Sequence, residues 1–179
     1  MVLAAGESKR FGSPKQLALF HGQPMLSHVC AECLKTVAEA VIVVVGASAE
    51  RIVPVLPSGV SVVTNEAWPE GMAGSIRAGV ERVNSEAVVL VLGDQPMVTE
   101  AQMVSLVRAL GSPADVAASQ YPDGSLGVPA TFGRNHFAAL QSLQGSSGAK
   151  GLFNEATKRV PCHEIADVDT PGDLIELGG

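Results

Sequence analysis

The first fifteen residues constrain the fold more than any other segment of the chain. The apolar run 1–5 predicts a buried strand, and it leads directly into a loop that holds Gly6 and Gly12 together with Arg10 and Lys15. Backbone N–H groups and two cations then lie at the carboxyl end of a first strand, where open α/β sheets bind ligands. Such a loop suits a polyphosphate, although its spacing matches neither G-x-G-x-x-G nor the P-loop pattern.

Apolar runs alternate with helix-like segments along the rest of the chain, which predicts an α/β fold with a mostly parallel sheet. Ser48 and Thr99 are expected to cap the helices that follow them. A turn-rich stretch, 121–129, is expected to form a hairpin excursion. The expected strands are 1–5, 41–45, 60–64, 87–92, 116–119 and 159–165, and the expected helices are 24–36, 48–55, 74–83, 99–110, 135–143, 149–157 and a short one from 170.

Composition limits the classes of protein that this chain can belong to. Its 179 residues suit one domain, which we place over residues 1–179, and a net charge of −6 argues against nucleic-acid binding. No apolar run approaches the roughly 20 residues that span a membrane, and no signal peptide is visible. Three cysteines, an odd number, predict free thiols in a reducing cytoplasm. Because the first strand is short, we expect further residues before it in the natural chain.

Acidic residues follow two of the expected strands. Asp94 comes directly after the apolar run 88–92, so it faces the same crevice as the first loop and could coordinate Mg²⁺ that bridges nucleotide phosphates. The alternative is a turn aspartate in an Asp-Gln-Pro bend. Asp167 and Asp169 stand before the last helix, where the alternative is helix capping by Thr170 or Asp169.

The segment 65–79 also carries residues suited to a ligand. Gly71 and Gly74 allow close approach of the backbone before a helix N-terminus, and Ser75 with the first amides could bind a base or a ribose hydroxyl. The alternative is an ordinary strand–helix loop in which Trp68 is a packing plug.

Cysteines and histidines show no catalytic pattern. Cys30 and Cys33 lie near the end of the first expected helix, where the negative partial charge disfavours a thiolate. No second pair completes a zinc site, so we interpret both, and Cys162, as packing residues. The histidines do not have the spacing of metal ligands: His21, His28, His136 and His163.

Several motifs together resemble one known family. The first loop, Leu3-Ala-Ala-Gly-x-Ser-x-Arg-x-Gly-x-x-Lys-Gln-Leu17, is similar to the signature of the MobA-like nucleotidyltransferases, above all the molybdenum cofactor cytidylyltransferases (MocA-like). The segments 93–96, 65–79 and 167–174 resemble the metal motif, the nucleoside loop and the acidic C-terminal segment of that family. The resemblance implies a Rossmann-like three-layer α/β/α domain of the nucleotidyltransferase type.

The resemblance also implies an activity and its residues. An acceptor phosphate attacks the α-phosphorus of an NTP and pyrophosphate leaves; the implied donor is CTP and the implied acceptor is molybdopterin, whose dinucleotide product serves a molybdenum hydroxylase as partner. Arg10 would grip the β,γ-phosphates and Lys15 the α-phosphate, while Asp94 with Asp167 or Asp169 would hold Mg²⁺. The implied nucleotide-binding residues are Leu3, Ala4, Ala5, Gly6, Arg10, Lys15, Asn65, Gly71, Ser75 and Asp94.

Departures from the family pattern leave alternatives open. The segments 127–132 and 145–150 resemble the acceptor side, but Ser146 stands where the family usually shows Asp. A donor such as GTP, or a sugar- or alcohol-phosphate acceptor, is one alternative; Ala5 and Pro14-Lys15 argue against the guanylyl type of loop. A non-catalytic carrier of the cofactor is another, and the retained acidic residues argue against it.

Overall fold

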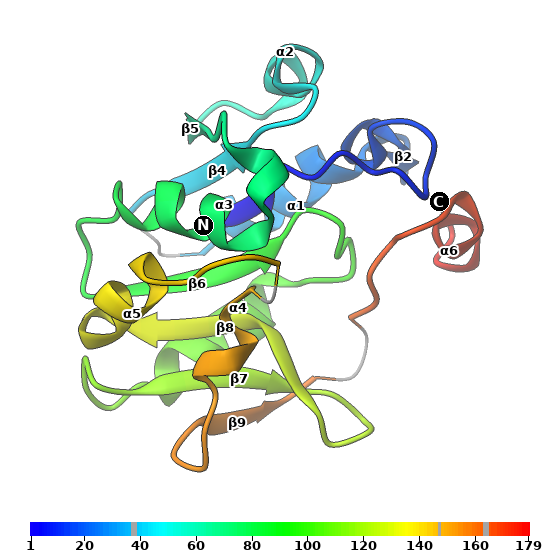
Figure 1. The fold of residues 1–179 in the computed structure, drawn as a ribbon. Coiled ribbons are helices and arrows are strands. Elements are labelled where there is room, and N and C mark those ends of the chain that lie inside the picture. The colour runs from blue at the N-terminus through cyan, green and yellow to red at the C-terminus, as the bar shows by residue number, and fades with distance from the viewer. Residues whose placement is uncertain (37–38, 147, 163–164) are drawn as a thin grey trace.

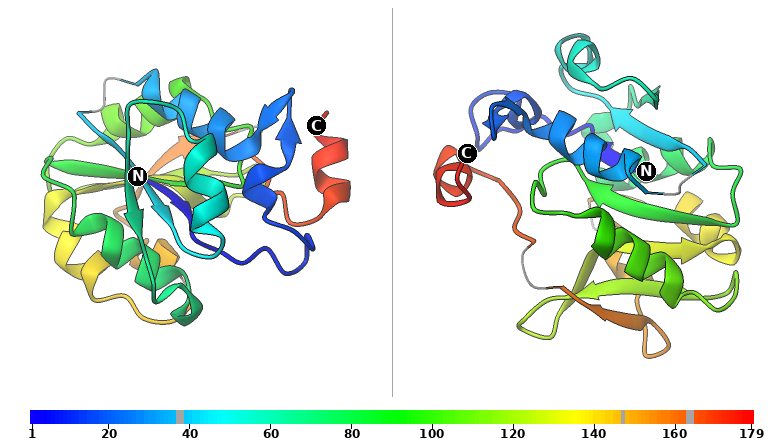
Figure 2. Two further views of the ribbon diagram at one scale, coloured as in Figure 1. Left: turned by 90° about the horizontal axis from the view of Figure 1, so that it is seen from above. Right: turned by 180° about the vertical axis from the view of Figure 1, so that it is seen from behind.

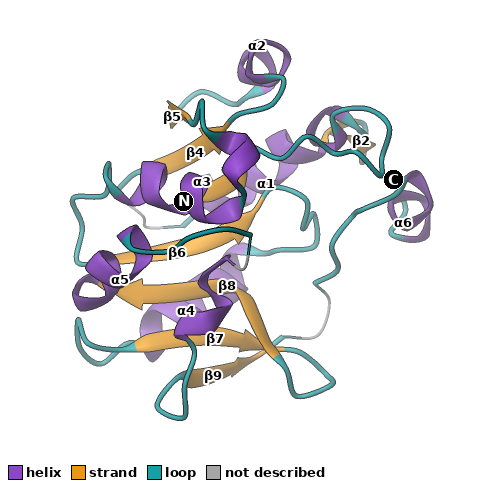
Figure 3. Cartoon of the chain, viewed as in Figure 1, coloured by secondary structure: helices purple, strands orange, loops and turns teal. Residues whose placement is uncertain are grey.

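The computed structural model describes residues 1–36, 39–146, 148–162 and 165–179. Its centre is a seven-stranded sheet in the order β5-β4-β1-β6-β8-β7-β9 (Figures 1 and 3). All neighbouring strands pair in parallel except β8, which is antiparallel to β6 and β7. The strands are β1 (Val2–Ala4), β4 (Val41–Val45), β5 (Val60–Thr64), β6 (Ala87–Leu92), β7 (Val116–Gln120), β8 (Leu126–Gly133) and β9 (Lys158–Pro161).

Helices cover both faces of this sheet and make three layers. α3 (Met72–Val80) and α5 (Phe137–Gln141) lie on one face, and α1 (Met25–Leu34) and α4 (Glu100–Ala109) lie on the other (Figures 1 and 2). Alternate residues of β1 enter the two cores, Leu3 with Ile76 of α3 and Val2 with Leu26 of α1. The expected Rossmann-like α/β/α architecture is confirmed.

The C-terminal segment returns to the N-terminal part of the chain. After β9 it passes the end of β6, where the Val168 N–H donates to the Asp94 carbonyl at 2.9 Å. α6 (Pro171–Glu176) then packs Leu174 against Phe20 of the small hairpin formed by β2 (Leu19–Phe20) and β3 (Gln23–Pro24) (Figure 1). This route brings the last acidic residues beside the first loop.

The hairpin expected over 121–129 is confirmed, because β7 and β8 pair antiparallel across the turn at residues 121–125, but its second half is a strand of the main sheet. Residues from Leu126 belong to β8, which continues to Gly133 inside the main sheet. The ladder with β7 shifts register between Ala118 and Ser119, and Pro129 lies at this irregularity. A proline without an N–H is accommodated where the ladder is interrupted, so the turn-forming composition concealed a strand.

Two helix predictions and one cap also need correction. The segment 149–157 contains only the 3-10 turn Gly148–Leu152, and 135–143 divides into the 3-10 turn Arg134–His136 and α5. Ser48 has φ 57° and makes no side-chain cap on α2 (Ala49–Ile52), because a left-handed residue replaces the expected extended one. The remaining short 3-10 turns are Lys15–Leu17, Val53–Val55 and Trp68–Glu70.

Other local predictions are confirmed. The Thr99 hydroxyl accepts from the Gln102 N–H at 3.3 Å, and Thr170 forms a capping box with Asp173. The expected last strand, 159–165, is too long: β9 ends at Pro161, and neither Cys162 nor Ile165 is in a strand. Residues 163–164 of that prediction lie outside the described residues. No helix in the described ranges is long and apolar enough to cross a membrane.

Candidate nucleotide site

The first loop is held in shape by one buried glutamine. Gln16 is 3% exposed, and its amide nitrogen donates to the carbonyls of Ala4 and Gly6, each at 3.1 Å. The Ser8 hydroxyl donates to the Gln16 side-chain oxygen at 3.2 Å and accepts from the Lys15 N–H at 3.3 Å. The backbone between β1 and Lys15 is therefore preorganised, and the sequence analysis missed this role of Gln16.

This loop forms one side of a cavity of about 720 Å³ at the carboxyl ends of the central strands. Such a volume is typical of small-molecule sites, which take roughly 300–1,000 Å³. The other sides come from the segment before α3, from the end of β6 and from the C-terminal segment. The cavity is lined by Leu3, Ala4, Ala5, Gly6, Glu7, Ser8, Lys9, Arg10, Lys15, Gln16, Trp68, Pro69, Gly71, Met72, Ser75, Leu92, Gly93, Asp94, Ser146 and Asp169.

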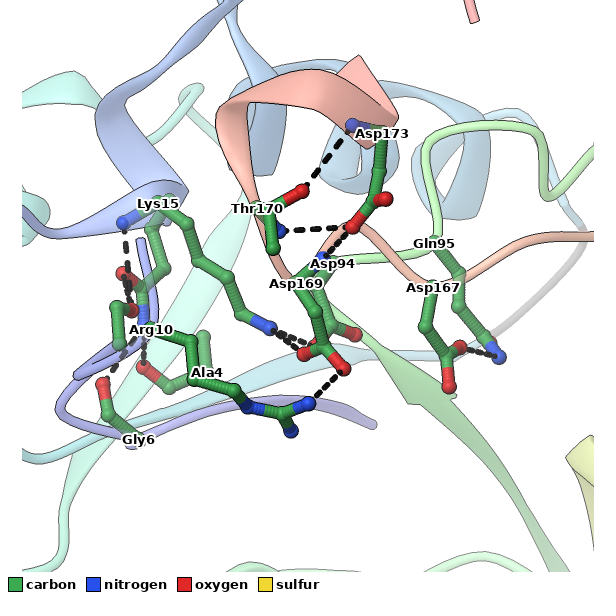
Figure 4. A network of polar contacts seen from close by, with 12 residues as sticks. Ala4, Gly6, Arg10, Lys15, Asp94, Gln95, Asp167, Asp169, Thr170 and Asp173 are labelled. Carbon is green, nitrogen blue, oxygen red and sulfur yellow. Dashed lines mark hydrogen bonds and ion pairs between the residues drawn. The ribbon is translucent and has the colours of Figure 1, made fainter. Parts of the chain in front are cut away.

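Two cations and two carboxylates meet in this cavity. The Lys15 Nζ lies 2.6 Å from Asp94 Oδ2 and 3.1 Å from Asp169 Oδ1, and Arg10 Nη1 lies 3.0 Å from Asp169 Oδ2 (Figure 4). The Lys15 side chain is 14% exposed and that of Arg10 is 76% exposed. Lys15 is therefore the inner cation, and Arg10 lies toward solvent.

Burial and charge perturb the inner pair. Burial lowers the pKa of Lys15, but attraction to Asp94 and hydrogen bonds to both carboxylates outweigh this, and the pKa lies above its usual value. Burial raises the pKa of Asp94; the Lys15 ammonium opposes this shift and the Asp167 carboxylate adds to it. The single ammonium of Lys15 thus forms ion pairs with two carboxylates, those of Asp94 and Asp169.

The two acidic residues of the C-terminal segment have different partners. Asp169 lines the cavity, and its N–H donates to Asp173 Oδ2 at 2.8 Å in the cap of α6. Asp167 Oδ1 accepts from the amide nitrogen of Gln95 at 2.8 Å, and Gln95 is itself 1% exposed. Asp169 therefore contacts the two cations, whereas Asp167 contacts Gln95, away from Lys15 and Arg10 (Figure 4).

A cation site can be assessed from the free acceptor atoms. Asp94 Oδ1 is buried and has no hydrogen-bond partner, so one carboxylate oxygen remains available for a cation. Asp94 and Asp169 offer hard oxygen ligands, which suit Mg²⁺ or Mn²⁺. Within the described ranges, however, three or more acidic, histidine or cysteine side chains are nowhere gathered as a ready-made metal site. The residues fit a cation that is also held by a ligand such as a polyphosphate.

The segment before α3 and the first turn of α3 together supply another wall of the cavity. Asn65 and Ser75 are 6% and 5% exposed, and the Asn65 amide nitrogen donates to Ser75 Oγ at 3.1 Å. Ser75 lines the cavity, whereas Asn65 lies behind it and accepts from the Ala67 N–H at 3.1 Å. Trp68 also lines the cavity, which extends the packing role expected from the sequence.

Residues 145–146 pack directly on this wall. A Cβ on Gly71, whose φ is +108°, would lie 2.7 Å from the Gly145 carbonyl oxygen, so only glycine suits this position. The close approach at Gly71 is thus to the protein's own backbone, and its predicted approach to a ligand stays a prediction. Two segments, 127–132 and 145–150, were predicted to line the acceptor side. The second contributes Ser146 to the cavity lining, whereas the first lies within β8 and contributes no lining residue.

The cysteines take no part in the site. All three are buried, and burial raises the pKa of Cys30 to about 12 and also raises that of Cys33. Cys30 and Cys33 lie in one apolar core cluster with Val29 and Met103, which confirms the packing interpretation for these two residues.

A glycine-containing loop at the centre of a parallel sheet, with cations and carboxylates in one cavity, defines an α/β protein of the nucleotide-binding transferase class. Residues 1–160 match the family model described as the MobA-like NTP transferase domain, and the chain belongs to that family.

Known proteins agree with this assignment. The chain is 38% identical over 110 residues to the bifunctional protein GlmU of Alkaliphilus metalliredigens; the match covers 60% of this chain and 24% of that protein, so the chain spans about a quarter of the relative's length. The Rv0371c homologue of Mycobacterium sp. strain JC1 superposes with a TM-score of 0.87 at 29% identity and covers 99% and 94% of the two chains. Rv0371C of Mycobacterium tuberculosis, solved in complex with manganese, gives 0.84 at 28% identity and covers 98% and 95%.

Proposed function

We propose that this protein transfers a cytidylyl group from CTP to the terminal phosphate of a molybdopterin-type acceptor and releases pyrophosphate. The observation that carries the proposal is the meeting of Lys15 and Arg10 with Asp94 and Asp169 in one cavity. The resemblance of the first loop and of the segment 93–96 to molybdenum cofactor cytidylyltransferases supports the choice of donor and acceptor. The product would serve a molybdenum hydroxylase in the cytoplasm.

The first loop would bind the base and the triphosphate. The backbone of residues 3–6 lines the cavity and is braced by Gln16, so its polar groups are oriented before the ligand arrives. Ser75 and the backbone around Gly71 would contact the nucleoside from another wall of the cavity. Asn65 would act through Ser75, since it lies behind it.

Asp94 and Asp169 would hold Mg²⁺, with Asp167 as the alternative second ligand. The unpartnered Asp94 Oδ1 favours such a cation, and a relative that is 28% identical was solved with manganese. A bound divalent cation would orient the triphosphate and offset its charge.

Lys15 and Arg10 would neutralise the phosphates. Their present partners are carboxylates, which phosphate oxygens can replace with similar charge-assisted hydrogen bonds. Lys15 is the inner cation and would lie by the α-phosphorus, where negative charge grows during the attack, and the guanidinium of Arg10 would bind the leaving β,γ-phosphates. A phosphate acceptor is already ionised near neutral pH, so the site needs no general base.

The test is pyrophosphate release by the purified protein with molybdopterin and Mg²⁺, with CTP and GTP supplied separately. Release with CTP and formation of the cytosine dinucleotide are expected. Binding of CTP without release in the presence of acceptor would instead support a carrier of the cofactor.

Ser146 favours a second candidate function within the same class. It lines the cavity at a position where the resemblance leads us to expect Asp. A neutral hydroxyl there suits a sugar- or alcohol-phosphate acceptor as well as a pterin. Pyrophosphate release with such phosphates, and none with molybdopterin, would establish this alternative.

A further inference from the structure

Two segments far apart in the sequence make one wall of the cavity. The 3-10 turn Trp68–Glu70 and the start of α3 contribute Trp68 and Met72, and the segment that follows α5 contributes Ser146. We call residues 68–72 the nucleoside segment and residues 143–146 the α5 segment. The wall keeps its shape only if these two segments stay together.

Backbone contacts join the segments at the cavity. The Ala73 N–H, in the first turn of α3, donates to the Gly145 carbonyl at 3.1 Å. Gly71 packs so closely that a Cβ would lie 3.1 Å from the Ser146 Cα. These contacts fix the position of the α5 segment relative to α3, but they involve only Gly145 and Ser146, at its C-terminal end.

Arg77 joins the same segments from behind the cavity. Its Nη1 donates to the Leu143 carbonyl at 2.6 Å, and its Nη2 lies 3.2 Å from Glu70 Oε2. Its side chain is 31% exposed and does not line the cavity. A planar guanidinium can bind two acceptors at once in a fixed geometry, whereas an ammonium offers a single point charge.

We infer that Arg77 is a positioning residue of the nucleotide site: by bridging Glu70 and the Leu143 carbonyl, it holds the nucleoside and α5 segments as one wall. This inference rests on the proposed function for its link to nucleotides. Glu70 is the last residue of the turn that carries Trp68, and Leu143 begins the segment that carries Ser146. Loss of the bridge lets both cavity-lining side chains move.

The chain contains a single tryptophan, so Trp68 reports on the wall directly. Arg77→Met keeps most of the length of the side chain and removes both donors. We expect its acrylamide quenching constant for Trp68 to rise about twofold and its Kd for CTP, measured in the presence of Mg²⁺, to rise about five- to tenfold, since a hydrogen bond from a charged donor to the partly buried Leu143 carbonyl is lost.

Arg82→Met is the matched control. Arg82 is exposed just beyond the end of α3, so this variant loses the same charge without touching the wall. It is expected to keep the wild-type quenching constant, CTP Kd and kcat. If Arg82→Met changed the CTP Kd as much as Arg77→Met does, net charge would explain the effect and the inference would be overturned.

Arg77→Lys keeps the positive charge but cannot bridge Glu70 and the Leu143 carbonyl at once, so it separates the effect of the bridge from that of the charge. Its ammonium can keep one partner at a time, so intermediate quenching and an intermediate Kd are expected. Wild-type values in a folded Arg77→Met variant would overturn the inference, and if that variant does not fold, a wild-type Kd in Arg77→Lys would overturn it. The quenching measurement needs no nucleotide, so it tests Arg77 even if the wild type proves not to bind CTP and the proposed function fails.

Discussion

Lys15 occupies the place where a divalent cation is expected. Its ammonium lies between Asp94 and Asp169, at 2.6 Å and 3.1 Å from their oxygens, and it leaves Asp94 Oδ1 as the oxygen without a partner. A divalent cation that binds both carboxylates must displace this ammonium. We therefore expect Lys15→Met to bind Mn²⁺ more tightly than the wild type in the absence of nucleotide, although it binds CTP more weakly.

The magnitude follows from the burial of the pair. At an effective dielectric constant of about 20, unit charges 2.6 Å apart attract by about 6 kcal/mol, but desolvation offsets most of this. A net contribution of about 1.5–3 kcal/mol is typical of a hydrogen bond between charged groups. Because each 1.4 kcal/mol is tenfold, removing the ammonium should lower the Kd for Mn²⁺ by about ten- to hundredfold.

The assay is the electron paramagnetic resonance signal of free Mn²⁺ during titration with protein, without nucleotide. Work at about pH 8 limits proton uptake by Asp94, whose pKa would rise further once the opposing ammonium is gone. Lys35→Met is the control. Lys35 pairs with Glu32 on α1, so this variant removes the same charge at a place away from the cavity. An unchanged or weaker Mn²⁺ affinity in folded Lys15→Met would refute the competition between ammonium and metal.

Four further outcomes follow. Asp94→Asn should keep the fold but lose about 10²–10³ in Mg²⁺-dependent kcat, and a folded, fully active variant would exclude Asp94 as a ligand. CTP should exceed GTP in kcat/KM by at least about tenfold, because we expect the base to bind between residues 4–6 and 71–75, where the Ala5 methyl group would narrow the space and favour a pyrimidine; equal values would exclude base selection of this kind. Cys30 and Cys33 should not react with a disulfide reagent until the protein unfolds, because burial raises both pKa values; rapid labelling of native protein would contradict this. Gly71→Ala should destabilise the fold by about 1–3 kcal/mol in urea unfolding, because a positive φ and a contact of 2.7 Å oppose a Cβ; unchanged stability would show that the wall can shift.

The sequence was most informative where local and global preferences agree. The apolar run of β4 is buried on both faces, so its composition alone identified a central parallel strand. β8 escaped prediction because Gly127 and Pro129 are typical of turns, and only pairing with β6 and β7 makes this segment extended. Tertiary pairing outweighed local propensity there.

The site was predictable to a similar degree. Lys15 and Asp94 could be identified because each follows the end of a central strand, and such ends share one edge of the sheet. The contact of Lys15 with Asp169 spans 154 positions and depends on the path of the C-terminal segment, which no local pattern encodes. Gln16 was part of the recognised motif, yet its bracing of two carbonyls depends on the shape of the folded loop.

The path of the C-terminal segment has a consequence for biosynthesis. Asp169 is translated after every strand of the main sheet, because β9 ends at Pro161. The carboxylate that pairs with Arg10 is therefore the last member of this charge cluster to be synthesised. Proteolytic cleavage after β9 would leave every strand of the main sheet in the chain but remove Asp169, so the cleaved molecule would lack the carboxylate that pairs with both Arg10 and Lys15 (Figure 1).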